Sequence, residues 1–159
     1  MTKSQKSAQR VIVGWREWVQ LPELGIPGIK AKVDTGAKTS AIHAFKIVPF
    51  EDGGEQYVRF CVHPVQRHKL PELNCTAKVF DRRTVTSSNG QRDLRYVIRT
   101  RLALGEKQWP VEMTLSNRDE MGFRMLLGRE ALQKRVMVDP GASYKLGKFD
   151  DDEFYNIQI

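Results

Sequence analysis

The sequence is poor in cysteine and has no long apolar run. Only two cysteines, Cys61 and Cys75, occur in 159 residues. They are too few for a disulfide framework, which fits a reducing compartment. No apolar stretch approaches the roughly 20 residues that a membrane-spanning helix needs. The first residues are polar and basic, without the apolar core of a secretory signal. We therefore expect a cytoplasmic protein with no membrane contact.

Aromatic side chains are also scarce, at 9% of the residues, so valine, isoleucine and leucine must fill most of the core. Apolar residues make up 40% and charged residues 28%, a balance typical of globular rather than disordered chains. The net charge of +7 would attract polyanions. The basic residues are nevertheless scattered, with no run of five and no interleaved aromatic residues. This pattern favours a solvated surface over a nucleic-acid interface.

The length fits one domain with a substantial core. We expect residues 1–10 to be a disordered leader, because they are polar and basic. Residues 11–147 would form the domain. Residues 148–159 would form an acidic tail, since four consecutive acids begin at Asp150.

The dominant periodicity is two, which predicts strands. Apolar and polar residues alternate in segments 29–33, 58–62, 95–104 and 109–116, and in the second of these Cys61 falls on the polar face. Turn residues predict two hairpins, one at Gly105–Gln108 and one at Asn89-Gly90. One short helix is expected near the C-terminal end, over residues 129–135. The pattern predicts an all-β, mostly antiparallel fold, closed or nearly closed so that its edges are hidden.

The segment 29–33 leads directly into Asp34-Thr35-Gly36-Ala37. A strand would hold the carboxylate rigidly, and Gly36 would allow a sharp turn and the close approach of a substrate. Thr35 could form a hydrogen bond to a neighbouring loop. The same residue types are common in ordinary turns, so the tetrapeptide alone favours a turn.

A second segment, Met125-Leu126-Leu127-Gly128-Arg129, would by itself be a core strand that leads into a short helix. Together and in this order, the two segments resemble retropepsin-like aspartic peptidases. In that class an apolar-apolar-Gly-Arg segment crosses behind the Asp-Thr-Gly-Ala loop. The likeness covers roughly residues 11–147. It extends to a bacterial and archaeal family once labelled "putative ATP-dependent zinc protease" and now described as retropepsin-like. The segments that carry it are 13–17, 21–26, 30–37, 117–129, 138–141 and 143–144.

The resemblance implies an acid-protease barrel that acts as a homodimeric aspartic peptidase. Each chain has one Asp-Thr-Gly, whereas the chemistry needs two carboxylates, so two Asp34 side chains would meet across a two-fold axis. One would stay protonated, because like charges that close cannot both ionise. The ionised carboxylate would activate a water, and its protonated partner would polarise the peptide carbonyl. Thr35 would bridge the two loops, and Gly36 would offer its carbonyl to the substrate.

The resemblance also implies supporting and binding residues. Leu127, Gly128 and Arg129 would support the active loop from behind. A flap that closes over the substrate would be the hairpin turn at 87–90, although a plain surface hairpin is an equal alternative. The substrate-binding residues would then be Ala37, Lys38, Ser88, Asn89 and Gly90.

Lys38 departs from retroviral members, which often carry an acid at this position. Arg129 then needs another partner, such as Glu130 or Asp139, or has another role. Positive charge at Lys32 and Lys38 would suit an acidic substrate such as a glutamate-rich peptide.

Two alternatives to this peptidase stay open. The family label suggests zinc, and Cys61, His63, His68 and Cys75 are possible ligands, but their spacing matches no established zinc pattern and no His-Glu-x-x-His occurs. We therefore expect no metal and no cofactor. Members of the family are associated with ATP-grasp ligases that add glutamate to proteins, which implies such a ligase as a partner. The second alternative is a non-catalytic module that holds a peptide beside this ligase.

Overall fold

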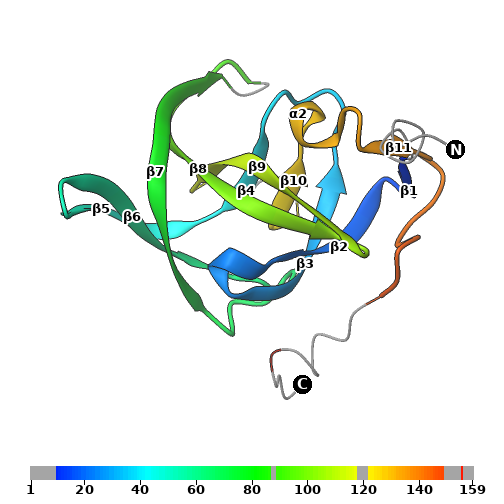
Figure 1. Cartoon of the computed structure of the whole chain (residues 1–159), viewed down its shortest axis with the longest axis horizontal. Helices are drawn as coiled ribbons and strands as arrows, with labels where there is room; N and C mark the ends of the chain where they lie inside the picture. Colours follow the sequence, from blue (N-terminus) through cyan, green and yellow to red (C-terminus); the bar gives the residue numbers. More distant parts are fainter. Residues whose placement is uncertain (1–9, 87–88, 118–121, 149–154, 156–159) are drawn as a thin grey trace, which may run out of the picture.

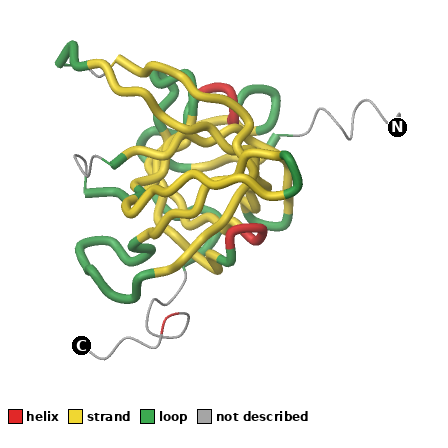
Figure 2. Tube along the Cα trace, turned by 90° about the vertical axis from the view of Figure 1, so that its left-hand side faces the viewer, coloured by secondary structure: helices red, strands yellow, loops and turns green. Residues whose placement is uncertain are grey.

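The computed structural model describes residues 10–86, 89–117, 122–148 and 155 (Figure 1). The predicted leader falls largely outside the described residues, as do Ser87, Ser88 and most of the predicted acidic tail. Strands make up most of the body (Figure 2), which confirms the all-β prediction. The strands are β1 (Val11–Val13), β2 (Arg16–Leu21), β3 (Ile26–Val33), β4 (Ser40–His43), β5 (Phe45–Asp52), β6 (Glu55–Val62), β7 (Leu73–Thr86), β8 (Arg92–Leu104), β9 (Lys107–Ser116), β10 (Met125–Leu127) and β11 (Val136–Val138).

Nine strands form one sheet, in the order β2-β3-β10-β4-β9-β8-β7-β6-β5. A further pairing joins β2 to β8 through Gln20 and Ala103, so that six of these strands close into a ring. Strands β7, β6 and β5 continue the sheet beyond the ring, and the β5–β6 hairpin projects from the body (Figure 1). Strands β1 and β11 form a separate two-stranded parallel sheet. This ring of paired strands agrees with the predicted closed or nearly closed all-β fold.

The core is aliphatic, as the scarcity of aromatic residues requires. In strand β9 the predicted apolar positions Trp109, Val111, Met113 and Leu115 are all buried, but Thr114 and Ser116, predicted to face outward, are buried as well. Cys61 departs from its predicted polar face, since it is only 5% exposed. The largest fully buried side chains are Phe60, Leu21, Ile26, Ile29, Ile42, Ile98, Leu102, Leu104, Met113, Leu115, Met125 and Leu127.

Both predicted hairpins are present. Strands β7 and β8 pair antiparallel on either side of Asn89-Gly90, and β8 and β9 pair on either side of Gly105. Gly90 and Gly105 have φ values of 84° and 62°, a region that favours glycine.

The helical segments are short. Helix α2 covers only Arg129–Leu132, so it ends earlier than predicted. A 3-10 helix at Pro22–Leu24 was not predicted. Within the described ranges, no helix has the length and apolar character needed to cross a bilayer.

Candidate active site

Asp34 follows the last residue of β3 and is held in place by the crossing strand β10. Leu127 on β10 pairs in parallel with Val33, while Leu126 pairs antiparallel with Ala41 on β4. The Asp34 amide donates a hydrogen bond of 2.8 Å to the carbonyl of Leu127. The chain from 34 to 39 therefore leaves β3 and returns to β4 with β10 lying between these two strands.

The loop also orders its own carboxylate. The Gly36 amide donates to Asp34 Oδ1 over 3.0 Å, and the Ala37 amide donates to the Asp34 carbonyl over 3.2 Å. Thr35 and Gly36 are exposed, and Asp34 is half-buried. The carboxylate is thus oriented by a backbone amide and still accessible to a ligand.

Gly128 lies against the back of this loop, where a side chain has no room. A Cβ atom at this position would lie 2.6 Å from the Thr39 carbonyl carbon and 3.0 Å from the Ala37 oxygen. The Gly128 amide donates to Ser40 Oγ over 3.0 Å. The close contact requires glycine, which gives a physical reason for the glycine of the Gly-Arg pair in the sequence.

The first residues of α2 complete the support. The amides of Arg129 and Glu130 donate to the carbonyls of Ala37 and Lys38, over 2.6 and 3.0 Å. The Arg129 side chain donates from Nη1 to the Thr35 carbonyl over 3.3 Å. Arg129 therefore contacts the active loop directly, instead of pairing with Glu130 or Asp139. Leu127, Gly128 and Arg129 all touch the loop that they were predicted to support.

A cavity of about 860 Å³ opens beside the active loop. One wall is the loop itself, through Asp34 and residues 36–39, with Glu130 of α2. The opposite wall consists of Arg83–Thr86 on β7 and Arg95 on β8, while Glu112 and Thr114 on β9 complete the lining. The β7–β8 hairpin therefore faces the active loop, as a flap would.

The predicted flap turn is only partly described. Asn89 and Gly90 lie exposed at the hairpin tip and do not line the cavity, and Ser88 is outside the described residues. Ala37 and Lys38, by contrast, do line the cavity beside Asp34. The strand of the hairpin, rather than its turn, forms the wall opposite Asp34.

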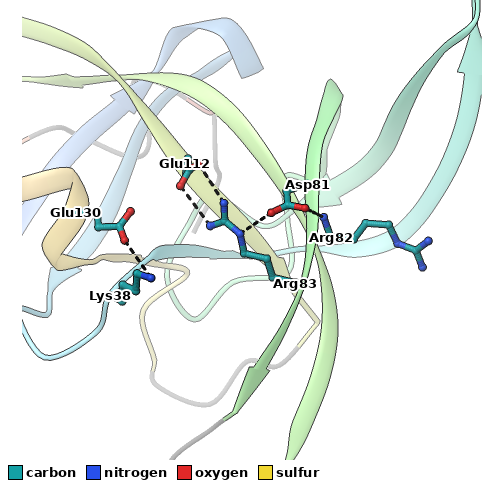
Figure 3. Close-up of polar contacts among 6 residues, drawn as sticks. All are labelled: Lys38, Asp81, Arg82, Arg83, Glu112 and Glu130. Atoms are coloured by element: carbon teal, nitrogen blue, oxygen red, sulfur yellow. Dashed lines mark hydrogen bonds and ion pairs between the residues drawn. The ribbon is translucent and has the colours of Figure 1, made fainter.

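The cavity carries charges of both signs, arranged in pairs (Figure 3). Lys38 lies 3.7 Å from Glu130 on the loop wall. On the hairpin wall, Arg83 pairs with Glu112 and also with Asp81. Hydrogen bonds to these two carboxylates raise the pKa of Arg83, and the hydrogen bond from Arg83 lowers the pKa of Asp81. Arg95 pairs with Asp93 over 3.6 Å.

The possible zinc ligands do not gather into a site. Cys61 Sγ donates to Asn74 Oδ1, and Cys75 Sγ donates to the Leu24 carbonyl. Burial raises the pKa of Cys75 to about 11, which disfavours the thiolate that zinc binds. His63 stacks on Phe45 with ring centroids 4.3 Å apart. Over residues 10–86, 89–117, 122–148 and 155, no three His, Cys, Asp or Glu side chains converge to hold a metal.

Several residues at the site were not predicted from the sequence, among them Ser40, Arg83, Arg95 and Glu112. Ser40 and Glu112 have no local motif, because their partners lie 88 and 29 positions away. The Asn89-Gly90 turn indicates only that Arg83 falls in a hairpin, not which face of the hairpin its side chain occupies. It predicts a β7–β8 hairpin, and in that hairpin Arg83 lies directly opposite Arg95 on the cavity side.

This arrangement defines a class of protein. An Asp-Thr-Gly loop crossed from behind by a Leu-Gly-Arg segment, beside a cavity with a facing hairpin, is the retropepsin arrangement implied by the sequence resemblance. A family model described as "Retropepsin-like aspartic endopeptidase RimB" matches residues 12–148. The chain therefore belongs to the RimB-like family.

Two further comparisons found similar proteins. A "probable alpha-L-glutamate ligase" of Shewanella halifaxensis is 50% identical over 147 residues, covering 92% of this chain and 32% of the relative. A protein of the same name from Parasynechococcus marenigrum is 49% identical over 145 residues, covering 91% and 31%. The chain thus spans about a third of the length of these relatives. The crystal structure of a Legionella pneumophila protein of unknown function has a TM-score of 0.71 and 27% identity, covering 87% of this chain and 99% of that one.

Proposed function

We propose that the chain is one subunit of a homodimeric aspartic endopeptidase, with Asp34 from each copy in a shared site. In this mechanism, one Asp34 carboxylate takes a proton from a water, which attacks the peptide carbonyl. The other, protonated, Asp34 polarises that carbonyl and then donates its proton to the leaving amine. The two carboxyls titrate as a pair, because one charge disfavours the other.

The observation that carries this proposal is which of the carboxylates around the cavity have a cationic partner. Three carboxylates line it, and two of them are neutralised by cations, Glu112 by Arg83 and Glu130 by Lys38. Asp34 forms no ion pair with any described residue, and its carboxylate accepts a hydrogen bond from the Gly36 amide. Asp34 is therefore the acid available for catalysis. The second carboxylate that the proposed mechanism needs has to come from Asp34 of another copy of the chain.

The small β1–β11 sheet supports the proposal that a second copy of the chain packs against this one. Ile12 and Met137 are register partners on adjacent strands, and they are 53% and 57% exposed. Two large apolar side chains side by side in solvent favour contact with another apolar surface. We propose that this pair belongs to the face on which the second subunit packs.

The proposed substrate is an acidic, glutamate-containing peptide. Lys38 and Arg95 both line the cavity, although each already has a carboxylate neighbour. Partly exposed ion pairs are worth about 1 kcal/mol or less, so a substrate carboxylate can replace the resident one. Because the matching relatives are named glutamate ligases, we propose that the domain acts beside such a ligase, on chains that carry glutamate.

The test is cleavage of a glutamate-rich peptide by wild-type protein and by Asp34→Asn. Asp52→Asn is a matched control, because Asp52 is an exposed acid at the end of β5, away from the cavity. We expect Asp34→Asn to lose cleavage, to retain peptide binding and to leave the dimer mass in sedimentation unchanged. Unchanged cleavage by Asp34→Asn would reject the peptidase.

Zinc-dependent cleavage is separated from carboxylate chemistry by inhibitors. We expect a statine-containing peptide to inhibit and a chelator to have no effect. The reverse result would favour a metal site that the second subunit helps to form.

A non-catalytic binding module is the second candidate, favoured by the names of the relatives and by the paired charges in the cavity. It predicts that wild type and Asp34→Asn bind the peptide equally and that neither cleaves it. Peptide mass spectrometry alongside fluorescence anisotropy distinguishes this outcome from the peptidase.

A further inference from the structure

Strand β7 changes its register at the base of the hairpin that faces Asp34. Val79 pairs with Ile98 and Asp81 pairs with Val97, so Phe80 is an extra residue in β7. Such a bulge bends its strand and increases the local twist. The residues that line the cavity, Arg83–Thr86, begin three positions beyond it. The bulge at Phe80 therefore lies at a position where a change in strand direction alters how the hairpin lies over the active loop.

Asp81, the first residue after the bulge, accepts hydrogen bonds from the next two residues of its own strand. Its Oδ1 accepts a hydrogen bond from the Arg82 amide, and its Oδ2 accepts one from Arg83 Nε, both over 2.8 Å. The Arg83 guanidinium is thereby fixed close to the bulge.

The same guanidinium reaches across the sheet. Its Nη1 donates to Glu112 Oε2 over 3.3 Å, and its Nη2 donates to Glu112 Oε1 over 3.2 Å. Glu112 belongs to β9, and β8 lies between β7 and β9. Figure 3 shows the side chain spanning from the hairpin strand to Glu112. We name these contacts among Asp81, Arg83 and Glu112 the Arg83 bridge.

We propose that the Arg83 bridge is a positioning device that sets the hairpin at the height over Asp34 at which a peptide substrate is held. The inference rests on the proposed function and adds a residue whose role is distinct from the chemistry of Asp34. A planar guanidinium suits this task, because its two parallel donors fix direction as well as distance. The contacts of the bridge can also rearrange, since the Arg83 and Glu112 side chains are 33% and 24% exposed to solvent.

The neighbouring arginine offers a matched control. Arg82 has the same charge and chain length, but its guanidinium lies 5.3 Å from the Tyr96 ring centroid. Figure 3 shows it pointing away from Glu112, and it does not line the cavity. A substitution at Arg82 removes the same charge from the same strand while the bridge stays intact.

The first experiment compares kinetics for a glutamate-containing peptide and for a neutral peptide. We expect Arg83→Gln and Glu112→Gln each to raise KM about tenfold for both peptides, equivalent to about 1.4 kcal/mol. We expect kcat to change less than about threefold, because Asp34 and its loop are untouched. Arg82→Gln should stay within about twofold of wild type in both parameters. Arg83→Lys should restore only part of the loss, since it lacks the paired donors.

Glu112→Gln separates positioning from direct contact with the substrate. If Arg83 bound substrate carboxylates itself, releasing it from Glu112 would lower KM for the glutamate peptide. Positioning predicts the opposite, so a lower KM in Glu112→Gln overturns the proposal. An Arg82→Gln effect as large as that of Arg83→Gln overturns it too.

A second measurement does not depend on cleavage. Backbone hydrogen exchange at Thr84, Val85 and Thr86 should speed up in Arg83→Gln and Glu112→Gln and stay unchanged in Arg82→Gln. Unchanged exchange in Arg83→Gln contradicts the bridge, whatever the peptidase assay shows. The opposite outcome is also informative. If cleavage does not depend on Asp34 but exchange is faster in both bridge variants, the peptidase proposal is rejected and the Arg83 bridge is retained.

Discussion

The two walls of the cavity are built in different ways. The Asp34 loop is held by main-chain hydrogen bonds from β10 and α2 and by the close contact with Gly128. The facing hairpin has its own β7–β8 main-chain ladder, but its Arg83 is joined to Asp81 and to Glu112 on β9 by side-chain ion pairs that are partly exposed to solvent. Buried main-chain contacts are costly to break, whereas exposed ion pairs exchange easily. The wall formed by the Asp34 loop is therefore rigid enough to position a catalytic acid, whereas the hairpin wall can adjust to a substrate.

The largest expected effect comes from adding one methyl group to the rigid wall. Gly128→Ala places a Cβ 2.6 Å from the Thr39 carbonyl carbon, so the loop must move. We expect a loss of about 3 kcal/mol in the free energy of unfolding, measured by urea denaturation. Gly141→Ala is the control, since its new Cβ would lie 3.6 Å from the nearest atom outside its chain neighbours. Equal losses for both variants would contradict this account of the loop.

A smaller effect is expected from Ser40→Ala in the same wall. Ser40 is buried, and its hydroxyl accepts the hydrogen bond from the Gly128 amide. Its removal leaves a buried donor without that partner, which costs about 1–2 kcal/mol. Thr84→Ala, an exposed hydroxyl on the facing hairpin, should change the unfolding free energy by less than about 0.5 kcal/mol. If Thr84→Ala destabilised more than Ser40→Ala, the ranking of the two walls would be reversed.

On the hairpin wall, Arg83→Gln should cost less than about 1 kcal/mol of unfolding free energy, because its partners are partly exposed. The cost should shrink further in 1 M salt, where charges are strongly screened. Thermal or urea unfolding at two salt concentrations checks this. A salt-independent loss as large as that of Gly128→Ala would show that both walls are equally rigid.

The smallest expected effect concerns the inner half of β7, below the bulge. Cys75 is 3% exposed, and burial raises its pKa to about 11. Because the raised pKa favours the neutral thiol, about one part in a thousand is thiolate at pH 8. We expect no detectable alkylation of Cys75 by iodoacetamide at pH 8 in the folded protein, and rapid alkylation in urea. Peptide mass spectrometry provides the measurement, and fast labelling of the folded protein would show that this half of β7 opens as readily as the hairpin.

Much of the rigid wall could be predicted from the sequence, because its signals are local. The strand before Asp34, the turn residues after it and the Leu-Gly-Arg segment each occupy a few consecutive positions. The short contact around Gly128 explains why that residue is glycine. The roles of Asp34, Thr35 and Gly36 in catalysis stay predictions.

The hairpin wall was less accessible to prediction. Its turn was visible as Asn89-Gly90, yet the Arg83 bridge depends on the alignment of three strands and on the extra residue Phe80. A bulge shifts the face of every following side chain, and no local sequence signal marks this one. The partners of Lys38 and Arg129 could not be predicted from the sequence either, since they depend on where α2 lies against the loop.

The most direct test of the account is the distance between the two Asp34 carboxylates in a crystal structure of the protein. We predict a symmetric dimer in which these carboxylates lie about 3 Å apart and share a proton. A lone subunit, or a dimer in which the Asp34 side chains lie far apart and face solvent, would contradict it.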